Sequence, residues 1–143
     1  KAKKSARQNV KKTVAPVVAC GRVAVVQRSH DGLLAGLWEL PNVEGHLTIQ
    51  QCTDQLNQWK LLFDSIKLLS SAKHIFTHIE WHMIGYLVST QKCSEFGNWV
   101  WATPKELADT YSIPTAFKAY IKETPHNMEE IIGGYSICLK LLC

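Results

Sequence analysis

Three histidines at four-residue intervals are the first group whose types and spacing could support chemistry: His74, His78 and His82. On a helix they would share one face, as zinc-binding histidines can. Residues 74–88, however, alternate between apolar and polar side chains, and this alternation predicts a strand with one buried face. Neighbouring histidines of the group would then lie about 13 Å apart, because each strand residue adds about 3.3 Å. That distance is too long for one metal ion, so the sequence predicts no metal site.

The tripeptide Phe76-Thr77-His78, expected at the start of that strand, brings together an aromatic ring, a hydroxyl and an imidazole. An aromatic ring can stack on a nucleobase, and a hydroxyl can both donate and accept hydrogen bonds. The tripeptide is therefore a candidate site for contacts to a base. The residues alone leave a second interpretation open, in which these are ordinary polar residues at the edge of a sheet.

A single carboxylate, Glu39, is a further candidate, because it lies at the end of a short apolar run that stops at Pro41. An isolated acidic residue is usually a solvated surface group, and we interpret Glu39 in that way. The five cysteines have no C-x-x-C spacing, so they predict neither a zinc site nor a disulfide framework. We interpret them as thiols in a reducing compartment, which predicts a cytoplasmic location.

The length of 143 residues and the hydrophobic content of 46% fit one domain with a substantial core and exclude a wholly disordered chain. No apolar run approaches the roughly 18 residues of a membrane-spanning helix, so no membrane association is expected. The positive charge is uneven, since residues 1–12 hold six basic groups and no acid. Residues 13–143 hold 10 basic and 12 acidic groups. Any phosphate binding must therefore come from individually placed cations or from the N-terminal segment.

Local patterns predict an α+β domain in which a hairpin comes first, one amphipathic helix follows, and further strands precede short helices. The hairpin has its turn at Gly21, and capping boxes open helices at Thr48 and Thr103. The expected strands are 14–19, 22–27, 65–69, 74–88 and 99–101, and the expected helices are 48–62, 103–109 and 115–123. The expected boundaries are a linker or disordered arm at 1–13, one domain at 14–124, and a tail of unknown role at 125–143.

The helix expected at 48–62 has apolar residues at alternating spacings of three and four, which is the helical period. They are Ile49, Cys52, Leu56, Trp59 and Phe63. We therefore expect this stripe to pack against the core, and we assign Trp59 and Phe63 to packing.

Four segments, taken in order, carry a resemblance to a known family. They are Gln27-Arg28 followed by Gly32-Leu-Leu-Ala-Gly-Leu-Trp-Glu-Leu-Pro41, then His74-Ile-Phe-Thr-His78, then Glu80-Trp-His-Met83 with Tyr86, and finally Ile113-Pro-Thr115. Residues 13–124 thereby resemble the C-terminal domain of bacterial MutY, the adenine DNA glycosylase family that removes adenine mispaired with 8-oxoguanine. The GLWELP segment is shared with Nudix hydrolases, whereas the FTH motif followed by the Glu80-Trp81 strand is more specific.

The resemblance implies a Nudix-like fold with a curved, mixed β-sheet flanked by helices. It also implies recognition of 8-oxoguanine opposite the mispaired adenine in base excision repair, with double-stranded DNA as the partner. In the family's motif the hydroxyl residue meets the lesion and its two neighbours steady it, so these roles pass to Thr77, Phe76 and His78. 8-Oxoguanine carries a proton on N7 and a carbonyl at C8, and one hydroxyl can serve both.

In this family, catalysis belongs to a separate helical domain with a catalytic glutamate and aspartate and a four-cysteine iron–sulfur cluster. A cluster needs closely spaced thiolates, and the five cysteines of this chain are widely separated. The resemblance therefore implies that the chain itself holds no catalytic residue, no metal and no cofactor. It implies a monomeric recognition domain that works beside the catalytic domain of the same polypeptide.

The alternative is a Nudix-type nucleotide pyrophosphohydrolase with a degenerate Nudix box. In Nudix hydrolases the helix after GLWELP carries glutamates that hold magnesium, an ion that prefers carboxylate and other oxygen ligands. The corresponding residues 43–63 contain two acids, Glu44 and Asp54, and no Arg-Glu or Glu-Glu pair. The sequence thus favours a fold that is kept and a hydrolase activity that is lost.

Overall fold

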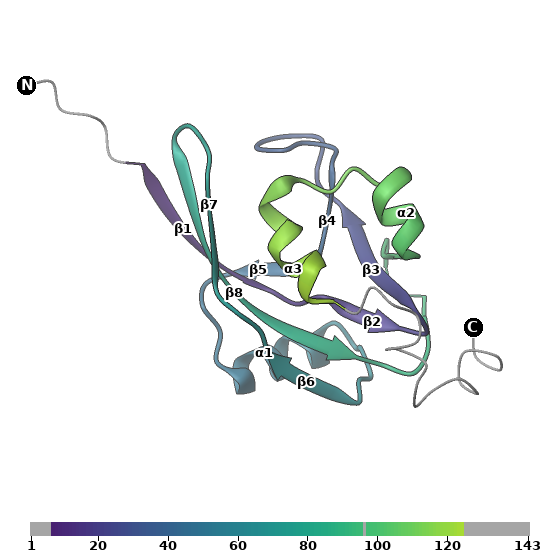
Figure 1. Cartoon of the computed structure of the whole chain (residues 1–143). Coiled ribbons are helices and arrows are strands. Elements are labelled where there is room, and N and C mark those ends of the chain that lie inside the picture. The colour runs from purple at the N-terminus through teal and green to yellow at the C-terminus, as the bar shows by residue number, and fades with distance from the viewer. Residues whose placement is uncertain (1–6, 96, 125–143) are drawn as a thin grey trace, which may run out of the picture.

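The computed structural model describes residues 7–95 and 97–124, which form an α+β domain around a mixed, open β-sheet (Figure 1). In chain order the elements are β1 (Gln8–Val14), β2 (Val17–Ala19), β3 (Arg22–Gln27), β4 (Trp38–Glu39), β5 (Asn42–Glu44), α1 (Ile49–Gln58), β6 (Ser65–Leu68), β7 (Ala72–Ile75), β8 (Ile79–Ser89), β9 (Val100–Ala102), α2 (Pro104–Asp109), the 3-10 helix η1 (Thr115–Phe117) and α3 (Lys118–Glu123). The helices α1 and α3 cover opposite faces of the sheet. No helix of these residues is long and apolar enough to cross a membrane.

Strand β8 is the centre of the sheet. Along one side it pairs in parallel with β1 and β2, and along the other it pairs antiparallel with β6 and β7. Its Trp81 and Met83 enter the hydrophobic cluster under α3, whereas Tyr86 and Val88 enter the cluster under α1. The prediction of one buried face therefore holds for residues 79–85 and is wrong for residues 86–89, where α1 covers the second face.

The single strand expected at 74–88 is also wrong, because the structure divides this segment into β7 and β8. The turn between them is the tripeptide Phe76-Thr77-His78, called here the FTH turn. The backbone N–H of Phe76 donates to the carbonyl of Ile79 at 2.7 Å and closes it. The turn contains no glycine, proline or asparagine, so the alternating pattern runs through it without a sequence signal.

The expected arm at 1–13 is corrected for residues 8–13, which belong to β1. This strand lies beside β8 in a parallel register from the Gln8–Ile79 pair to the Val14–Gly85 pair. Lys12 and Thr13 are buried, and the Thr13 hydroxyl donates to the carbonyl of Gly45 at 2.7 Å. Because β1 carries few apolar residues, its pairing rather than its composition makes it a strand. Residues 1–6 and the expected tail at 125–143 lie outside the described residues.

Helix α1 begins as predicted, since Thr48 and Gln51 form a reciprocal capping box. It ends at Gln58 rather than near residue 62, because Lys60 adopts a left-handed φ of 62°. The N–H groups of Lys60 and Leu61 then donate to the carbonyls of Asn57 and Leu56, which closes the helix end. A glycine usually occupies this left-handed position, so a lysine there gave no stop signal.

The packing expected for the apolar stripe is confirmed for Cys52, Leu56, Trp59 and Phe63 and is wrong for Ile49. Cys52 and Leu56 are buried, whereas Ile49 is 50% exposed. Trp59 and Phe63 follow the helix and are half-buried against the cluster under α1. Trp59 also contacts the ring of Trp99 edge-on, at 5.5 Å between centroids.

Several other predictions are confirmed. The β2–β3 hairpin turns at Cys20 and Gly21, which both have positive φ, and Thr103 opens α2 with a capping box. The helix expected at 115–123 begins as η1 and continues as α3. The buried Cys52 carries a free thiol, but Cys20 is disulfide-bonded, so the prediction of unpaired thiols is wrong for that residue. The odd count and irregular spacing of the cysteines gave no sign of this bond.

Helix α3 can lie close to the sheet because β8 has a glycine beneath it. A Cβ atom at Gly85 would overlap the ring of Tyr120. That ring is 1% exposed, and its hydroxyl donates to the carbonyl of Ser70 at 2.9 Å, so it has little freedom to move. Burial, together with the charge of Glu123, raises the pKa of Tyr120 to about 12.

We therefore expect Gly85→Ala to lower the free energy of unfolding by about 1–3 kcal/mol, the usual cost of overpacking. Urea denaturation followed by tryptophan fluorescence would measure it. In a Tyr120→Leu background the additional loss should shrink, because the overlapping ring is gone. An unchanged midpoint for Gly85→Ala alone would contradict this packing.

Candidate nucleic-acid interface

The FTH turn forms the tip of the β7–β8 hairpin, which extends away from the helices beside the N-terminal end of β1 (Figure 1). Thr77 and His78 are exposed, and Phe76 is half-buried. The backbone N–H of Gln8 donates to the carbonyl of His78 at 3.0 Å, which attaches β1 to the turn. The three residues predicted as a base-contacting site are thus brought together on one projecting turn.

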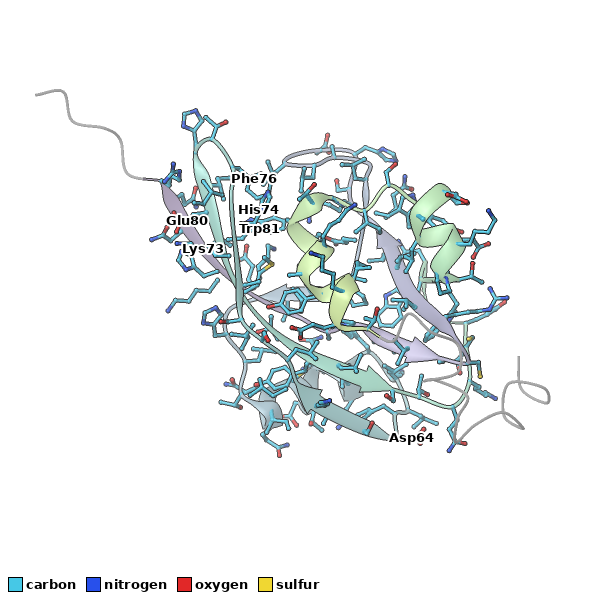
Figure 2. The ribbon with its side chains drawn as sticks, in the orientation of Figure 1. Asp64, Lys73, His74, Phe76, Glu80 and Trp81 are labelled. Atoms are coloured by element: carbon cyan, nitrogen blue, oxygen red, sulfur yellow. The ribbon has the colours of Figure 1, made fainter. Side chains whose placement is uncertain are left out.

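A chain of edge-to-face aromatic contacts connects this turn to the core. The ring of Phe76 lies 4.7 Å from that of His74 and 5.0 Å from that of Trp81. Trp81 is 2% exposed and contacts Phe117 at 5.6 Å between centroids. Figure 2 shows His74, Phe76 and Trp81 gathered on one side of the hairpin. The position of the turn is therefore set by packing as well as by backbone hydrogen bonds.

Two cations lie over the indole of Trp81. The Lys12 ammonium is 4.8 Å from the ring centroid, and the Arg28 guanidinium carbon is 5.7 Å from it. Arg28 forms an ion pair with Glu39 and donates from Nε to the carbonyl of Leu33 at 3.1 Å. The interpretation of Glu39 as a solvated surface group is therefore wrong, because its side chain is 17% exposed and paired.

The electrostatic environment of Lys12 follows from this crowding. Burial lowers the pKa of Lys12, and the nearby Arg28 charge lowers it further, while Glu39 and Glu44 act in the opposite direction. The Lys12 ammonium also donates to Oδ1 of Asn42 at 3.3 Å. Sequence reasoning missed Lys12 as part of this site because it placed the residue in a flexible arm.

The three histidines at four-residue intervals do not converge. His74 pairs with Trp81 across the hairpin, His82 pairs with Lys73 on the opposite face, and His78 lies in the turn. Within residues 7–95 and 97–124, no group of three or more His, Cys, Asp or Glu side chains is placed to hold a metal ion.

The carboxylates that a hydrolase would need are not assembled at α1. Asp54 is exposed and accepts a hydrogen bond from Nε2 of Gln50 at 3.0 Å. Glu44 lies on β5, where it pairs across the strands with Lys12. The first turn of α1 contains no acidic residue. Helix α1 therefore presents one exposed carboxylate, Asp54, and no group of carboxylates that could hold a magnesium ion.

Comparisons with known proteins agree with this architecture. A family model described as NUDIX domain matches residues 13–123. No curated protein matches the chain by sequence. The C-terminal domain of mouse MUTYH, solved in complex with human PCNA, has a TM-score of 0.62 and 23% identity over 87% of this chain and 90% of that one.

Two further solved structures have the same fold. The MutT NUDIX hydrolase from Burkholderia pseudomallei has a TM-score of 0.63 and 17% identity over 83% of this chain and 100% of its own. The NUDIX domain of Shewanella oneidensis NrtR, solved with ADP ribose, has a TM-score of 0.59 and 14% identity over 85% of this chain and 91% of its own. At these identities the three structures establish the fold and do not assign an activity.

The ring contacts that connect Phe76 to the buried Trp81, called here the aromatic anchor, predict that two neighbouring residues differ in their contribution to stability. Phe76→Ala should lower the free energy of unfolding by about 2 kcal/mol, below the roughly 3–5 kcal/mol of a fully buried phenylalanine. Ile75→Ala is the matched control, since Ile75 is 47% exposed on the other face and should cost less than about 1 kcal/mol. Equal losses in urea denaturation would contradict the anchoring of the turn through Phe76.

Proposed function

The chain belongs to the NUDIX domain family, and we propose that it recognises 8-oxoguanine in DNA instead of hydrolysing a nucleotide. The observation that carries the proposal is the FTH turn, which exposes a threonine hydroxyl at the tip of a hairpin. Its neighbour Phe76 is packed on the buried Trp81, so the hydroxyl is presented by an anchored element.

The chemistry of the lesion matches that hydroxyl. 8-Oxoguanine differs from guanine in carrying a proton on N7 and a carbonyl oxygen at C8. A reader of this base needs an acceptor for the N7–H and a donor toward the oxygen, and one hydroxyl provides both. In this proposal Thr77 makes these contacts. Phe76 holds the turn through Trp81, and His78 holds it through its carbonyl bond to Gln8.

We further propose that the chain is the recognition domain of an A/G-specific adenine DNA glycosylase, with duplex DNA containing A·8-oxoguanine as its partner. The MutY resemblance of its motifs supports this assignment, and the mouse MUTYH C-terminal domain shares the fold. The catalytic residues and the iron–sulfur cluster would then belong to another domain of the same polypeptide. The mouse domain was solved with PCNA, so the proposed DNA partner depends on the FTH turn and its surroundings.

A nucleotide pyrophosphohydrolase is the second candidate, and the fold of the Burkholderia pseudomallei MutT hydrolase favours it. That activity depends on carboxylates gathered around magnesium. Asp54 lies on α1, where it accepts a hydrogen bond from Gln50, and Glu44 lies on β5, so the two carboxylates belong to different elements and argue against this candidate.

If the chain is a recognition domain and not a pyrophosphohydrolase, two activities should be absent. The chain should release no pyrophosphate from 8-oxo-dGTP above a no-enzyme control when magnesium is added. It should also excise no adenine from an A·8-oxoguanine duplex, because that chemistry belongs to the proposed catalytic domain. Magnesium-dependent turnover that is lost in Asp54→Asn would instead establish the hydrolase.

The recognition role predicts a loss of discrimination in Thr77→Ala. The ratio of affinities for A·8-oxoguanine and A·G duplexes should fall by a factor that corresponds to about 1–3 kcal/mol, the scale of a good base contact. Binding to the A·G duplex should barely change, because contacts to phosphates carry no sequence information. The ratio would be measured by fluorescence anisotropy at one fixed salt concentration.

Two further variants make this test specific. Thr77→Ser keeps the hydroxyl and should keep the ratio, and Thr110→Ala removes an exposed threonine of the helical side and should leave it unchanged. If Thr77→Ala retained the wild-type ratio, the reader of the lesion would be another residue.

A further inference from the structure

We propose that one face of the β1–β8–β7 ribbon, defined by Arg7, Lys11 and Lys73 and called here the basic face, binds the phosphate backbone of duplex DNA beside the FTH turn. This inference rests on the proposed function and adds the surface that would supply affinity. The turn can discriminate between bases, but a single hydroxyl cannot hold a polyanion. Most affinity for a duplex comes from cations that neutralise phosphates.

The first argument is the position of β1. Its basic residues belong to the sheet, and its first strand residue is hydrogen-bonded to the turn, from the Gln8 N–H to the His78 carbonyl at 3.0 Å. The positive charges of Arg7 and Lys11 are therefore held along the strand that reaches the candidate site. Three further lysines, Lys1, Lys3 and Lys4, precede this strand in the sequence.

The second argument is the register of the three strands. Lys11 of β1 and Lys73 of β7 are both paired with His82 of β8, one from each side. Residues paired in this way point to the same face of a sheet, so these side chains form a row across the ribbon. Two strand spacings separate Lys11 from Lys73, which is about 10 Å.

The third argument is the way the charges are held. Oxygen atoms of Glu80 lie 3.7 Å from Nη1 of Arg7, 3.6 Å from Nζ of Lys73 and 3.0 Å from Nε2 of His82. The Glu80 side chain is 15% exposed, whereas those of Arg7 and Lys73 are 48% and 56% exposed. One carboxylate at the base of the face thus lies beside two cations, Arg7 and Lys73, that reach into solvent.

The basic face also lies on a part of the sheet that α1 leaves uncovered. Helix α1 packs against the other half of β8, in the cluster that contains Tyr86 and Val88. Figure 2 places Lys73 and Glu80 on the side of the hairpin opposite His74, Phe76 and Trp81. The aromatic anchor and the basic face therefore use the two sides of one ribbon, and the exposed hydroxyl of Thr77 lies at its end.

The test compares two triple variants of the whole chain that remove the same charge. Arg7→Gln, Lys11→Gln and Lys73→Gln neutralise the basic face. The control Lys67→Gln, Lys92→Gln and Lys105→Gln neutralises three exposed lysines elsewhere. Affinity for A·8-oxoguanine and A·G duplexes is measured at several salt concentrations. Wild-type midpoints in thermal denaturation establish that both variants fold.

For the basic-face variant, the slope of log affinity against log salt should become shallower by about 0.9 for each phosphate that the protein no longer neutralises. The ratio of affinities for the two duplexes should stay at its wild-type value. The control should keep the wild-type slope. Equal slopes for the two variants would overturn the proposal, and so would tighter binding of the wild-type chain to anionic phosphatidylserine vesicles than to duplex DNA.

The same data separate this inference from the proposed function. One outcome is that Thr77→Ala abolishes the difference in affinity between the two duplexes while the basic-face variant keeps the wild-type salt dependence. In that case the phosphate-binding role of the basic face is wrong, and lesion recognition stands. If the wild-type chain binds the A·8-oxoguanine and A·G duplexes equally, while the basic-face variant shows the expected shallower salt dependence, the chain binds DNA through this face without reading the lesion. If the chain binds neither duplex at low salt, both proposals are wrong.

Discussion

The burial of the Trp81 indole is the interaction on which the rest of this structure depends. Its ring contacts Phe76 of the turn and Phe117 of the helical side, and it lies under the cations of Lys12 and Arg28. Edge-to-face aromatic pairs contribute about 0.5–1.5 kcal/mol beyond the burial of their area, and partly desolvated cation–π contacts add a similar amount. One side chain thereby joins the hairpin, the helical side and the loop that carries Arg28.

This arrangement explains how the FTH turn, the proposed site, is held in position although it lies at the end of a hairpin. An isolated two-stranded hairpin is marginally stable in water. Here β1 extends beside β8 to the base of the turn, and Phe76 is packed inward, so the hairpin is part of the sheet. A hydroxyl held in this way loses little freedom when it meets a base, and less of its interaction energy is spent on ordering.

The sequence predicted those parts of the structure that depend on local signals. The capping boxes at Thr48 and Thr103 and the turn at Gly21 are side-chain or backbone effects within a few residues. The Nudix-like fold came from the resemblance. The strand β1 and the left-handed Lys60 could not be predicted, because one depends on pairing with a distant strand and the other breaks the usual preference for glycine.

In the candidate site, too, local features were predicted from the sequence and long-range contacts were missed. Its three residues were chosen from the sequence, and the structure gathers them on one turn, but their role stays a prediction. Lys12 and the burial of Glu39 were missed for a physical reason. The Lys12 ammonium lies over the indole of Trp81, which is distant in the sequence. Glu39 is mostly buried as the partner of Arg28, and this ion pair forms only in the folded chain.

Register is the constraint that links this fold to the proposed recognition. Along β7 the side chains alternate, so Lys73 points to the basic face, His74 to the face of Trp81, and Phe76 again to that face. A shift of one residue would reverse every one of these positions. It would turn Phe76 away from the indole, bury Lys73 against the core, and release the hydroxyl of Thr77 from its anchored turn. Stability, proposed affinity and proposed discrimination therefore depend on one pairing, and the burial of Trp81 is what fixes it.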